Sequence, residues 1–301
     1  MEKVLLESVR EQRRSRRWGI LFKSLTFVYL FALLAIFIGD WEKAPPLHKG
    51  EHTALIEVDG LIAAGRDASA DNIVAGLRAA FEDDQTAGII LRINSPGGSP
   101  VQAGYVFDEI RRLRKKYPDT PLYAVVTDVC ASGGYYIAAA ADKIYANKAS
   151  IVGSIGVRMD SFGFVEALEK LGIERRLLTS GENKGMLDPF LPVDQEEVAH
   201  VKGMLRNIHQ QFIDIVKAGR GERLADDPRL FSGLVWTGEQ ALKLGLVDEL
   251  RSASEVAREV IGVDTIRDFT PKEDLLKRFA DRLGMALSRE LSAILNTPAL
   301  R

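Results

Sequence analysis

Ser132 lies where the sequence pattern changes from strand to helix. The segment 121–129, PLYAVVTDV, is typical of a buried strand, and the alanine-rich segment after Gly133 and Gly134 is typical of a helix. The first turn of a helix has unpaired amides and the positive end of the helix dipole, so it can stabilise an anion. Ser132 is therefore a candidate nucleophile. Serine is also a preferred helix N-cap, and its position alone favours that structural role.

A nucleophilic serine needs a base, and histidine is the first to consider. The chain has four histidines: His48 and His52 lie in a linker-like stretch, and His200 and His209 fall within a long helical pattern. None has an acidic residue nearby in an obvious triad arrangement. This absence points to lysine, which acts as a base when burial favours loss of its proton.

Two lysines are candidate bases. Lys143 follows the serine on the same predicted helix, which would carry it roughly 16 Å away. Lys184 lies in SGENKGMLDPF between Gly181 and Gly185, and apolar residues that could exclude water follow it. Most loop lysines are solvated, so the pattern by itself leaves the base undecided.

A second strand-to-helix turn contains two consecutive glycines. The segment INSPGGS, 93–99, ends an apolar strand just before a helical pattern. Glycine lets a backbone amide approach a substrate without side-chain obstruction, although a plain glycine-rich turn has the same composition. Taken together, the two turns predict that the amides of Gly98 and Gly133 converge on one oxygen and form an oxyanion hole.

The elements that must position these residues alternate between strand and helix, which predicts an α/β domain. Helical stripes occupy segments 71–83 and 99–117, and a long helix is expected between a capping box at Asp194 and a C-cap at Gly219. The amphipathic segment 272–295 is expected to pack on the domain or to lie on a membrane surface.

Composition and charge restrict the class of protein. Of the 301 residues, 46% are hydrophobic, and 40 Lys and Arg against 42 Asp and Glu give a net charge of -2, which offers no global positive charge for nucleic acid. The single cysteine, Cys130, excludes an intrachain disulfide.

The N-terminal region has the pattern of a membrane anchor. Residues 1–23 are rich in arginine, and the uncharged segment 24–39 is strongly apolar. Counted from Trp18, this stretch approaches the roughly 20 residues that a spanning helix needs. No convincing signal-peptidase site follows it. Because the basic residues precede the apolar run, we expect the N-terminus in the cytoplasm and the rest of the chain exported.

Four motifs together resemble one family. INSPGGS, CASGGYYIAAAADKIYAN, VGSIGV and the GENKG loop occur in the order and spacing of the bacterial signal peptide peptidase A family, and the resemblance runs from about Leu55 to Leu250. These relatives are membrane-bound serine proteases. The resemblance implies the Clp protease/crotonase-like fold, an α/β fold of repeated β-β-α units, here preceded by one N-terminal transmembrane helix. The segment MLDPFLPVD departs from the family pattern.

The resemblance also implies a role for each site residue. By this likeness Ser132 is the nucleophile and Lys184 the general base, Ser154 orients the lysine, and Gly98 and Gly133 form the oxyanion hole. No metal or cofactor is expected. The expected partners are cleaved signal peptides as substrates, membrane lipid around the N-terminal helix and further copies of the chain in a ring, with no nucleic acid.

The expected layout follows from these assignments. A basic cytoplasmic segment (1–17) precedes a transmembrane signal anchor (18–39) and a linker (40–52), followed by the protease domain (53–262) and a C-terminal strand and amphipathic helix (263–301). The expected location is the bacterial inner membrane, crossed once, with the catalytic domain on the periplasmic side. The expected function is a Ser-Lys endopeptidase that degrades remnant signal peptides or other short apolar peptides.

Two other functions remain open at this point. A crotonase-like acyl-CoA enzyme shares the oxyanion arrangement, but no obvious basic cluster for the nucleotide is present. A non-catalytic membrane scaffold is the second alternative, in which Ser132 is only a helix cap. Serine-directed acylating or phosphonylating reagents distinguish that scaffold from a hydrolase.

Overall fold

The computed structural model describes residues 16–32 and 50–271, and it divides the chain into two units, Met1–Gly50 and Glu51–Arg301. The first unit contains a helix at residues 16–32 whose side chains are exposed. Within the described ranges, no helix combines the length and the apolar character needed to cross a bilayer. The predicted anchor at 18–39 continues past residue 32, and the predicted helix at 272–295 falls entirely outside the described residues.

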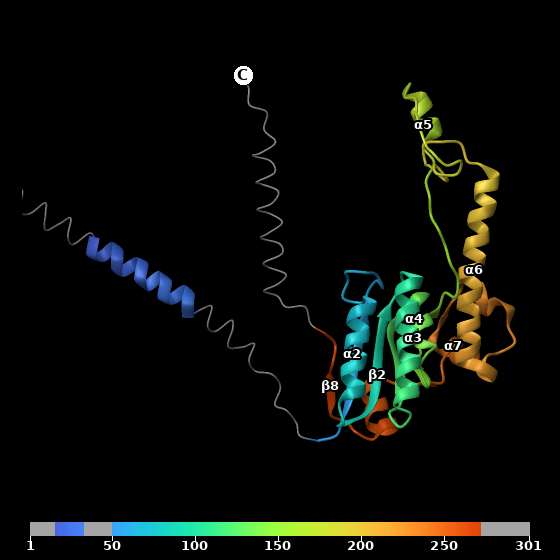
Figure 1. Ribbon diagram of the computed structural model, residues 1–301. Helices are drawn as coiled ribbons and strands as arrows, with labels where there is room; N and C mark the ends of the chain where they lie inside the picture. The colour runs from blue at the N-terminus through green and yellow to red at the C-terminus, as the bar shows by residue number, and fades with distance from the viewer. Residues whose placement is uncertain (1–15, 33–49, 272–301) are drawn as a thin grey trace, which may run out of the picture. The chain divides into compact units, whose positions relative to one another are not determined.

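The second unit is built on a mixed eight-stranded sheet (Figure 1). Its central path runs in the order β6-β5-β3-β2-β1-β8, and β4 pairs with β3 and with β7. The strands are parallel except for the antiparallel pair β5–β6. Their bounds are β1 (His52–Asp59), β2 (Thr86–Ser95), β3 (Leu122–Ala131), β4 (Lys143–Ala146), β5 (Ile151–Gly153), β6 (Val235–Thr237), β7 (Glu249–Leu250) and β8 (Ile266–Asp268).

The helices connect these strands. Short 3-10 turns, η1 and η2, follow the longest helix, and a π-helical segment, η3, precedes β8. The bounds are α2 (Ala70–Glu82), α3 (Pro100–Lys116), α4 (Gly133–Ala138), α5 (Val165–Lys170), α6 (Gln195–Arg220), η1 (Gly221–Arg223), η2 (Pro228–Phe231), α7 (Gly238–Lys243), α8 (Ala253–Glu255) and η3 (Val256–Ile261).

The expected α/β fold is present, but its repeating unit differs from the expectation. Strands β1, β2 and β3 each precede one helix, so the unit over this part of the chain is β-α and not β-β-α. In the place of a second strand, an isolated parallel bridge joins Ile62 to Gly98. This bridge brings the segment after β1 against the glycine turn that follows β2.

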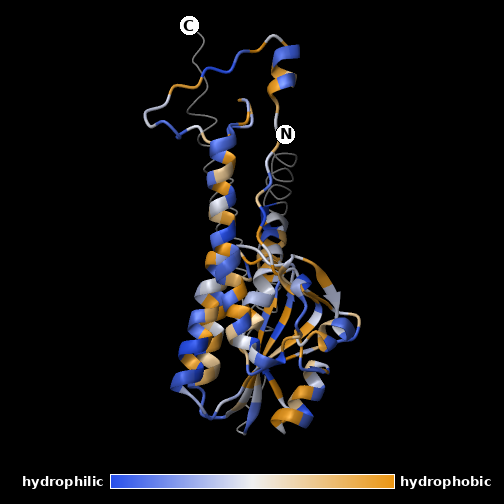
Figure 2. Cartoon of the chain, turned by 90° about the vertical axis from the view of Figure 1, so that its right-hand side faces the viewer, coloured by the Kyte–Doolittle hydropathy of each residue, from blue (hydrophilic) through white to orange (hydrophobic). Residues whose placement is uncertain are grey.

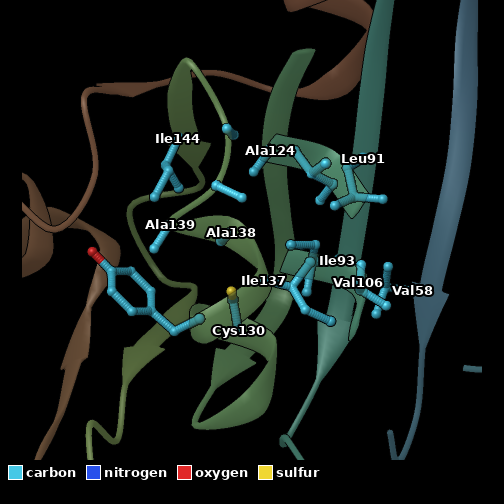
Figure 3. Packing of buried hydrophobic residues seen from close by; sticks show 14 of the residues in the cluster. Val58, Leu91, Ile93, Val106, Ala124, Cys130, Ile137, Ala138, Ala139 and Ile144 are labelled. Carbon is cyan, nitrogen blue, oxygen red and sulfur yellow. The ribbon is translucent and has the colours of Figure 1, made fainter. Parts of the chain in front are cut away.

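The core lies on both faces of the sheet because alternate strand residues point to opposite sides. Ile89, Leu91 and Ile93 belong to the larger cluster under α2, α3 and α4, whereas Ile90 belongs to a smaller cluster with Val256 from η3. Figure 3 shows the larger cluster, in which side chains from the strands meet those of α3 and α4. Strand β3 pairs with β4 through its first half and with β5 through its last three residues, and Ser132 comes directly after the part that pairs with β5.

Helix α6 differs in detail from its expected form. Asp194 caps its N-terminus by accepting from the amides of Glu196 and Glu197, at 2.7 and 3.1 Å. Glu197 does not complete a capping box, because its carboxylate accepts from the Leu187 amide at 3.1 Å. The predicted C-cap at Gly219 is wrong. The helix ends at Arg220, its C-cap is Gly221, and a β-carbon at Gly219 would lie only 2.1 Å from the carbonyl oxygen of Ala139.

Two further expectations need correction. The alanine-rich helix is short: α4 ends at Ala138, and Lys143 begins β4 and contacts Glu249 at 3.2 Å. His52 is not a linker residue, because it begins β1, is 3% exposed and stacks on Phe269.

Candidate active site

Ser132 occupies the sharp turn between β3 and α4. Its backbone has φ 51° and ψ −120°, a conformation that is rare for a residue with a side chain and is typical of strained functional turns. Its amide donates to the carbonyl oxygen of Gly153 at 2.8 Å. The side chain makes no capping hydrogen bond to α4. The helix-cap explanation of this serine is therefore wrong, and the hydroxyl is available for chemistry.

The glycine turn after β2 packs directly against this serine. A β-carbon at Gly97 would lie 2.6 Å from the Ser132 β-carbon, and one at Gly98 would lie 2.1 Å from the carbonyl oxygen of Ile62. Both glycines have positive φ, 102° and 152°. The glycine turn can lie this close to Ser132 and Ile62 only because neither Gly97 nor Gly98 has a side chain.

The two amides predicted to form an oxyanion hole are neighbours. A β-carbon at Gly133 would lie 3.3 Å from the amide nitrogen of Gly98. Gly133 is the first residue of α4, where a helix amide has no partner four residues earlier. Among the described residues, the Gly98 amide donates no backbone hydrogen bond. The two donors are thus placed close together beside the nucleophile candidate, as an oxyanion hole requires.

Ser154 lies on the same cleft as Ser132. It follows β5, has φ 53°, and its amide donates to the carbonyl oxygen of Leu234 at 2.7 Å. The bond from the Ser132 amide to Gly153 connects the two serine turns directly.

The cleft around these residues has a volume of about 1280 Å³. Its walls come from α3, α4 and α6, and from the segments after β5 and η2. Tyr136 of α4 packs against Phe107 and Phe212, with ring centroids 5.6 and 5.1 Å apart. Burial, and then the negative charge of Asp108, raise the pKa of the Tyr136 hydroxyl. The cleft is large enough for several residues of a peptide and is lined by both apolar and polar groups.

Lys184 does not line this cleft. It is exposed and follows a tight turn in which its amide donates to Gly181 at 3.1 Å. The bond from the Leu187 amide to Glu197 holds this loop at the start of α6, and about 18 Å of helix separates Glu197 from the cleft residue His209. Figure 1 shows α5, which precedes this loop, at the end of α6 remote from the sheet. The described chain therefore brings Ser132, Ser154, Gly98 and Gly133 together but leaves Lys184 apart.

The other residues considered as bases or nucleophiles lie at different places in the described chain. Cys130 is buried, which raises the pKa of its thiol well above the usual range. Lys143 is outside the cleft, on β4. His200 is exposed on the first half of α6. His209 does line the cleft, and its Nε2 lies 3.1 Å from the carbonyl oxygen of Ile155.

Sequence reasoning gave no role to two residues that line the cleft, Asp108 and Tyr136, and it considered His209 as a base without placing it in the cleft. The helices that carry Asp108 and His209 were predicted only from their apolar stripes. The spacing of Asp108, three and seven residues after Tyr105 and Val101, is the sequence signal that places these three residues on one face of α3. This face lines the cleft.

Comparisons with known proteins identify the family of this chain. The family model for peptidase family S49 matches residues 114–262, and that for Clp protease matches residues 60–152. A putative protease of Synechocystis, slr0021, is 30% identical over 252 residues, which is 78% of this chain and 88% of that protein. The chain belongs to peptidase family S49.

Two other relatives match over smaller shares of their length. The putative signal peptide peptidase SppA of Enterococcus faecium is 32% identical over 60% of this chain and 52% of its own length. A protein of Brucella abortus named Na(+)/H(+) antiporter NhaA is 44% identical over 69% of this chain, but the chain covers only 28% of that protein. The chain therefore spans about half or less of the length of these two relatives.

Proposed function

We propose that this S49 peptidase is a membrane-anchored endopeptidase that degrades remnant signal peptides or other short apolar peptides through a Ser-Lys dyad. The observation that carries the proposal is the strained turn of Ser132, whose side chain makes no helix cap and which packs against the glycine turn that contains Gly98. The apolar run at 24–39, preceded by arginines, supports the anchor and a periplasmic catalytic domain.

The catalytic cycle has an acylation step and a deacylation step, and Lys184 accepts and then returns a proton in each. The Ser132 hydroxyl attacks the scissile carbonyl carbon while neutral Lys184 accepts its proton, and the Gly98 and Gly133 amides donate to the resulting oxyanion. The peptide C–N bond then breaks, and the leaving amine takes the proton from the lysine. Water, deprotonated by the lysine, attacks the acyl carbon, the bond to the Ser132 oxygen breaks, and the lysine returns its proton to that oxygen. In this scheme Ser154 holds the lysine amine in place.

The dyad is assembled between two copies of the chain. Lys184 lies on a glycine-flanked loop at the far end of α6 and does not line the cleft of its own chain. This loop and α5 belong to segment 158–194, which we name the arm. Its exposed apolar side chains, including Phe162, Leu171 and Leu178, would be covered by a neighbour. Figure 2 shows such hydrophobic residues among the hydrophilic ones of the projecting segment. A closed ring would supply every Ser132 with a lysine from the adjacent copy.

Labelling with a fluorophosphonate tests the nucleophile. The full chain in detergent should be modified at Ser132, as located by mass spectrometry, and Ser132→Ala should lose the modification. Ser180→Ala, which removes an exposed serine on the arm, is the matched control and should label like the wild type. Modification that persists in Ser132→Ala would reject Ser132 as the nucleophile.

A further inference from the structure

One face of α3 forms a wall of the cleft. Val101, Gly104, Tyr105 and Asp108 all line it, and their spacing of three, four and seven residues places them on the same side of the helix. Val101 and Tyr105 are 56% and 60% exposed, so both are free to contact a bound peptide.

Asp108 brings an unpaired negative charge to this wall. Among the described residues its carboxylate has no hydrogen bond or ion pair, whereas its neighbour Glu109 contacts both Arg78 and Arg112. Of the basic residues on the cleft, Arg158 lies 3.5 Å from Asp160, and the Nε2 atom of His209 lies 3.1 Å from the carbonyl oxygen of Ile155. The cleft thus offers an anionic group that no side chain of the described chain neutralises.

The spacing along α3 between Gly104 and Asp108 suits a long side chain. A β-carbon at Gly133 would lie 3.6 Å from the β-carbon of Ala103, so this part of α3 is level with the start of α4. Tyr136 approaches α3 at Gly104, the residue after Ala103, because a β-carbon at Gly104 would lie 3.9 Å from the Tyr136 hydroxyl oxygen. Asp108 is one turn beyond, about 6 Å along the axis. The four-carbon stem of a lysine, or the similar length of an arginine, can cover this distance.

We propose that Asp108 is a specificity determinant that selects a lysine or arginine side chain of the bound peptide. The apolar stem of that side chain packs along Tyr105 and Tyr136, and its charge meets the Asp108 carboxylate. This inference rests on the proposed peptidase function and narrows its substrate class to apolar peptides that contain a basic residue. The junction between the basic and apolar regions of a signal peptide has this composition.

The test compares two quenched fluorescent peptides that differ at one position, lysine or methionine, in an alanine- and leucine-rich sequence. For the full chain we expect kcat/KM to favour the lysine peptide by about fivefold at low salt, the upper range for an exposed ion pair. The preference should fall as salt screens the charges. In Asp108→Asn the ratio of the two kcat/KM values should fall to about one.

Asp119→Asn is the matched control. It removes an exposed carboxylate beyond the other end of α3, outside the cleft, and should keep the wild-type ratio. An unchanged ratio in Asp108→Asn would overturn the proposal.

A binding measurement separates this inference from the proposed function. Affinities of both peptides for Ser132→Ala, with and without Asp108→Asn, are measured by fluorescence anisotropy, which needs no turnover. If the wild type cleaves neither peptide, the peptidase proposal fails, but a lysine preference in binding that depends on Asp108 still supports the selective site. Equal binding of both peptides to Ser132→Ala would reject that site independently.

Discussion

At the scale of single residues, the candidate site depends on two tight turns, one with no room for a side chain at Gly97 and Gly98 and one at Ser132. Ser132, Gly97 and Gly98 all have positive φ, and the glycine turn after β2 packs against the serine turn after β3. Such conformations are costly and persist where the surrounding structure holds them, which is typical of catalytic turns. The hydrogen bonds at Gly153 and Ile62 provide that support.

Gly98→Ala should therefore abolish activity and destabilise the domain by about 1–3 kcal/mol. The new methyl group would lie against the backbone oxygen of Ile62, which cannot move without breaking the bridge between these segments. Peptide hydrolysis and urea unfolding measure the two effects. Gly203→Ala on α6 is the control, because its methyl group would lie 3.8 Å from the nearest side-chain atom and alanine favours a helix. Full activity of Gly98→Ala would exclude that amide from the oxyanion hole.

Lys184→Arg should lower kcat by about 10²- to 10⁴-fold, the usual contribution of a general base. A guanidinium keeps its proton at all working pH values, so it cannot accept one from Ser132. Kinetics at pH 7 to 9 measure the loss, and circular dichroism checks the fold. Lys170→Arg, at the end of α5 on the same arm, is the matched substitution and should retain activity. If Lys184→Arg keeps most of its activity, the base must be sought elsewhere, with His209 as the first residue to test.

At the scale of elements, a buried ion pair attaches α6 to the sheet. The side chain of Arg220 is 1% exposed and contacts both carboxylate oxygens of Asp248, at 2.7 and 3.0 Å. Asp248 also accepts from the amide of Ile144 at 2.7 Å. Burial acts to raise the pKa of Asp248, but the bonds from Arg220 and Ile144 outweigh it and lower that pKa. This contact fixes the half of α6 that lines the cleft.

Asp248→Asn should destabilise the domain by about 3–5 kcal/mol, because it leaves a buried guanidinium without its counter-charge. Urea unfolding at pH 7 measures the change. Glu239→Gln, which breaks an exposed pair with Lys243 on α7, should cost less than about 1 kcal/mol. Equal effects of the two variants would show that the buried pair does not hold α6.

The same pair predicts a loss of stability in acid. Because the pKa of Asp248 is lower in the folded chain than its unfolded value of about 3.9, its contribution is complete above that value and is lost as the pH falls through the folded pKa. Glu109 acts in the same direction: the bond from Arg112 lowers its pKa to about 2, although burial opposes the shift. Unfolding midpoints from pH 6 down to pH 2 should fall more steeply for the wild type than for Asp248→Asn. Parallel curves would contradict this assignment.

At the scale of the whole molecule, Lys184 does not line the cleft that contains Ser132, which is the reason for proposing a dyad shared between copies of the chain. If each site takes its serine and its lysine from different copies, neither Ser132→Ala nor Lys184→Ala acts alone. Mixed in equal amounts within closed rings of random order, they should leave about a quarter of the sites complete.

Co-expression of the two variants with different tags tests this arrangement. Mixed oligomers are isolated through both tags, and peptide hydrolysis by them is compared with that of each parent and of the wild type. Recovery to about a quarter of the wild-type rate is the expected result. Activity no higher than that of the parents would place the dyad within one chain or reject it.

The sequence alone determined the local features, because strands, helices and glycine turns depend on nearby residues. The alternating apolar segments predicted the α/β domain, and the two strand-to-helix turns predicted that Ser132, Gly98 and Gly133 would meet. Predictions failed where a contact distant in the sequence decided the outcome. Gly219 was predicted to be a helix C-cap, but it lies within α6, where its backbone packs closely against Ala139.

Only the tertiary structure decided which side chains share the cleft. Asp108 and His209 lie about 100 residues apart in the sequence, on different helices that both line the cleft. Sequence periodicity predicts which residues share one face of a helix, but it does not predict which other element packs against that face. The structure also placed Lys184 away from Ser132, although the two motifs suggested one site. Backbone turns are set by short-range sterics, whereas the surroundings of a side chain depend on how whole elements pack, and for Lys184 on a neighbouring chain as we propose.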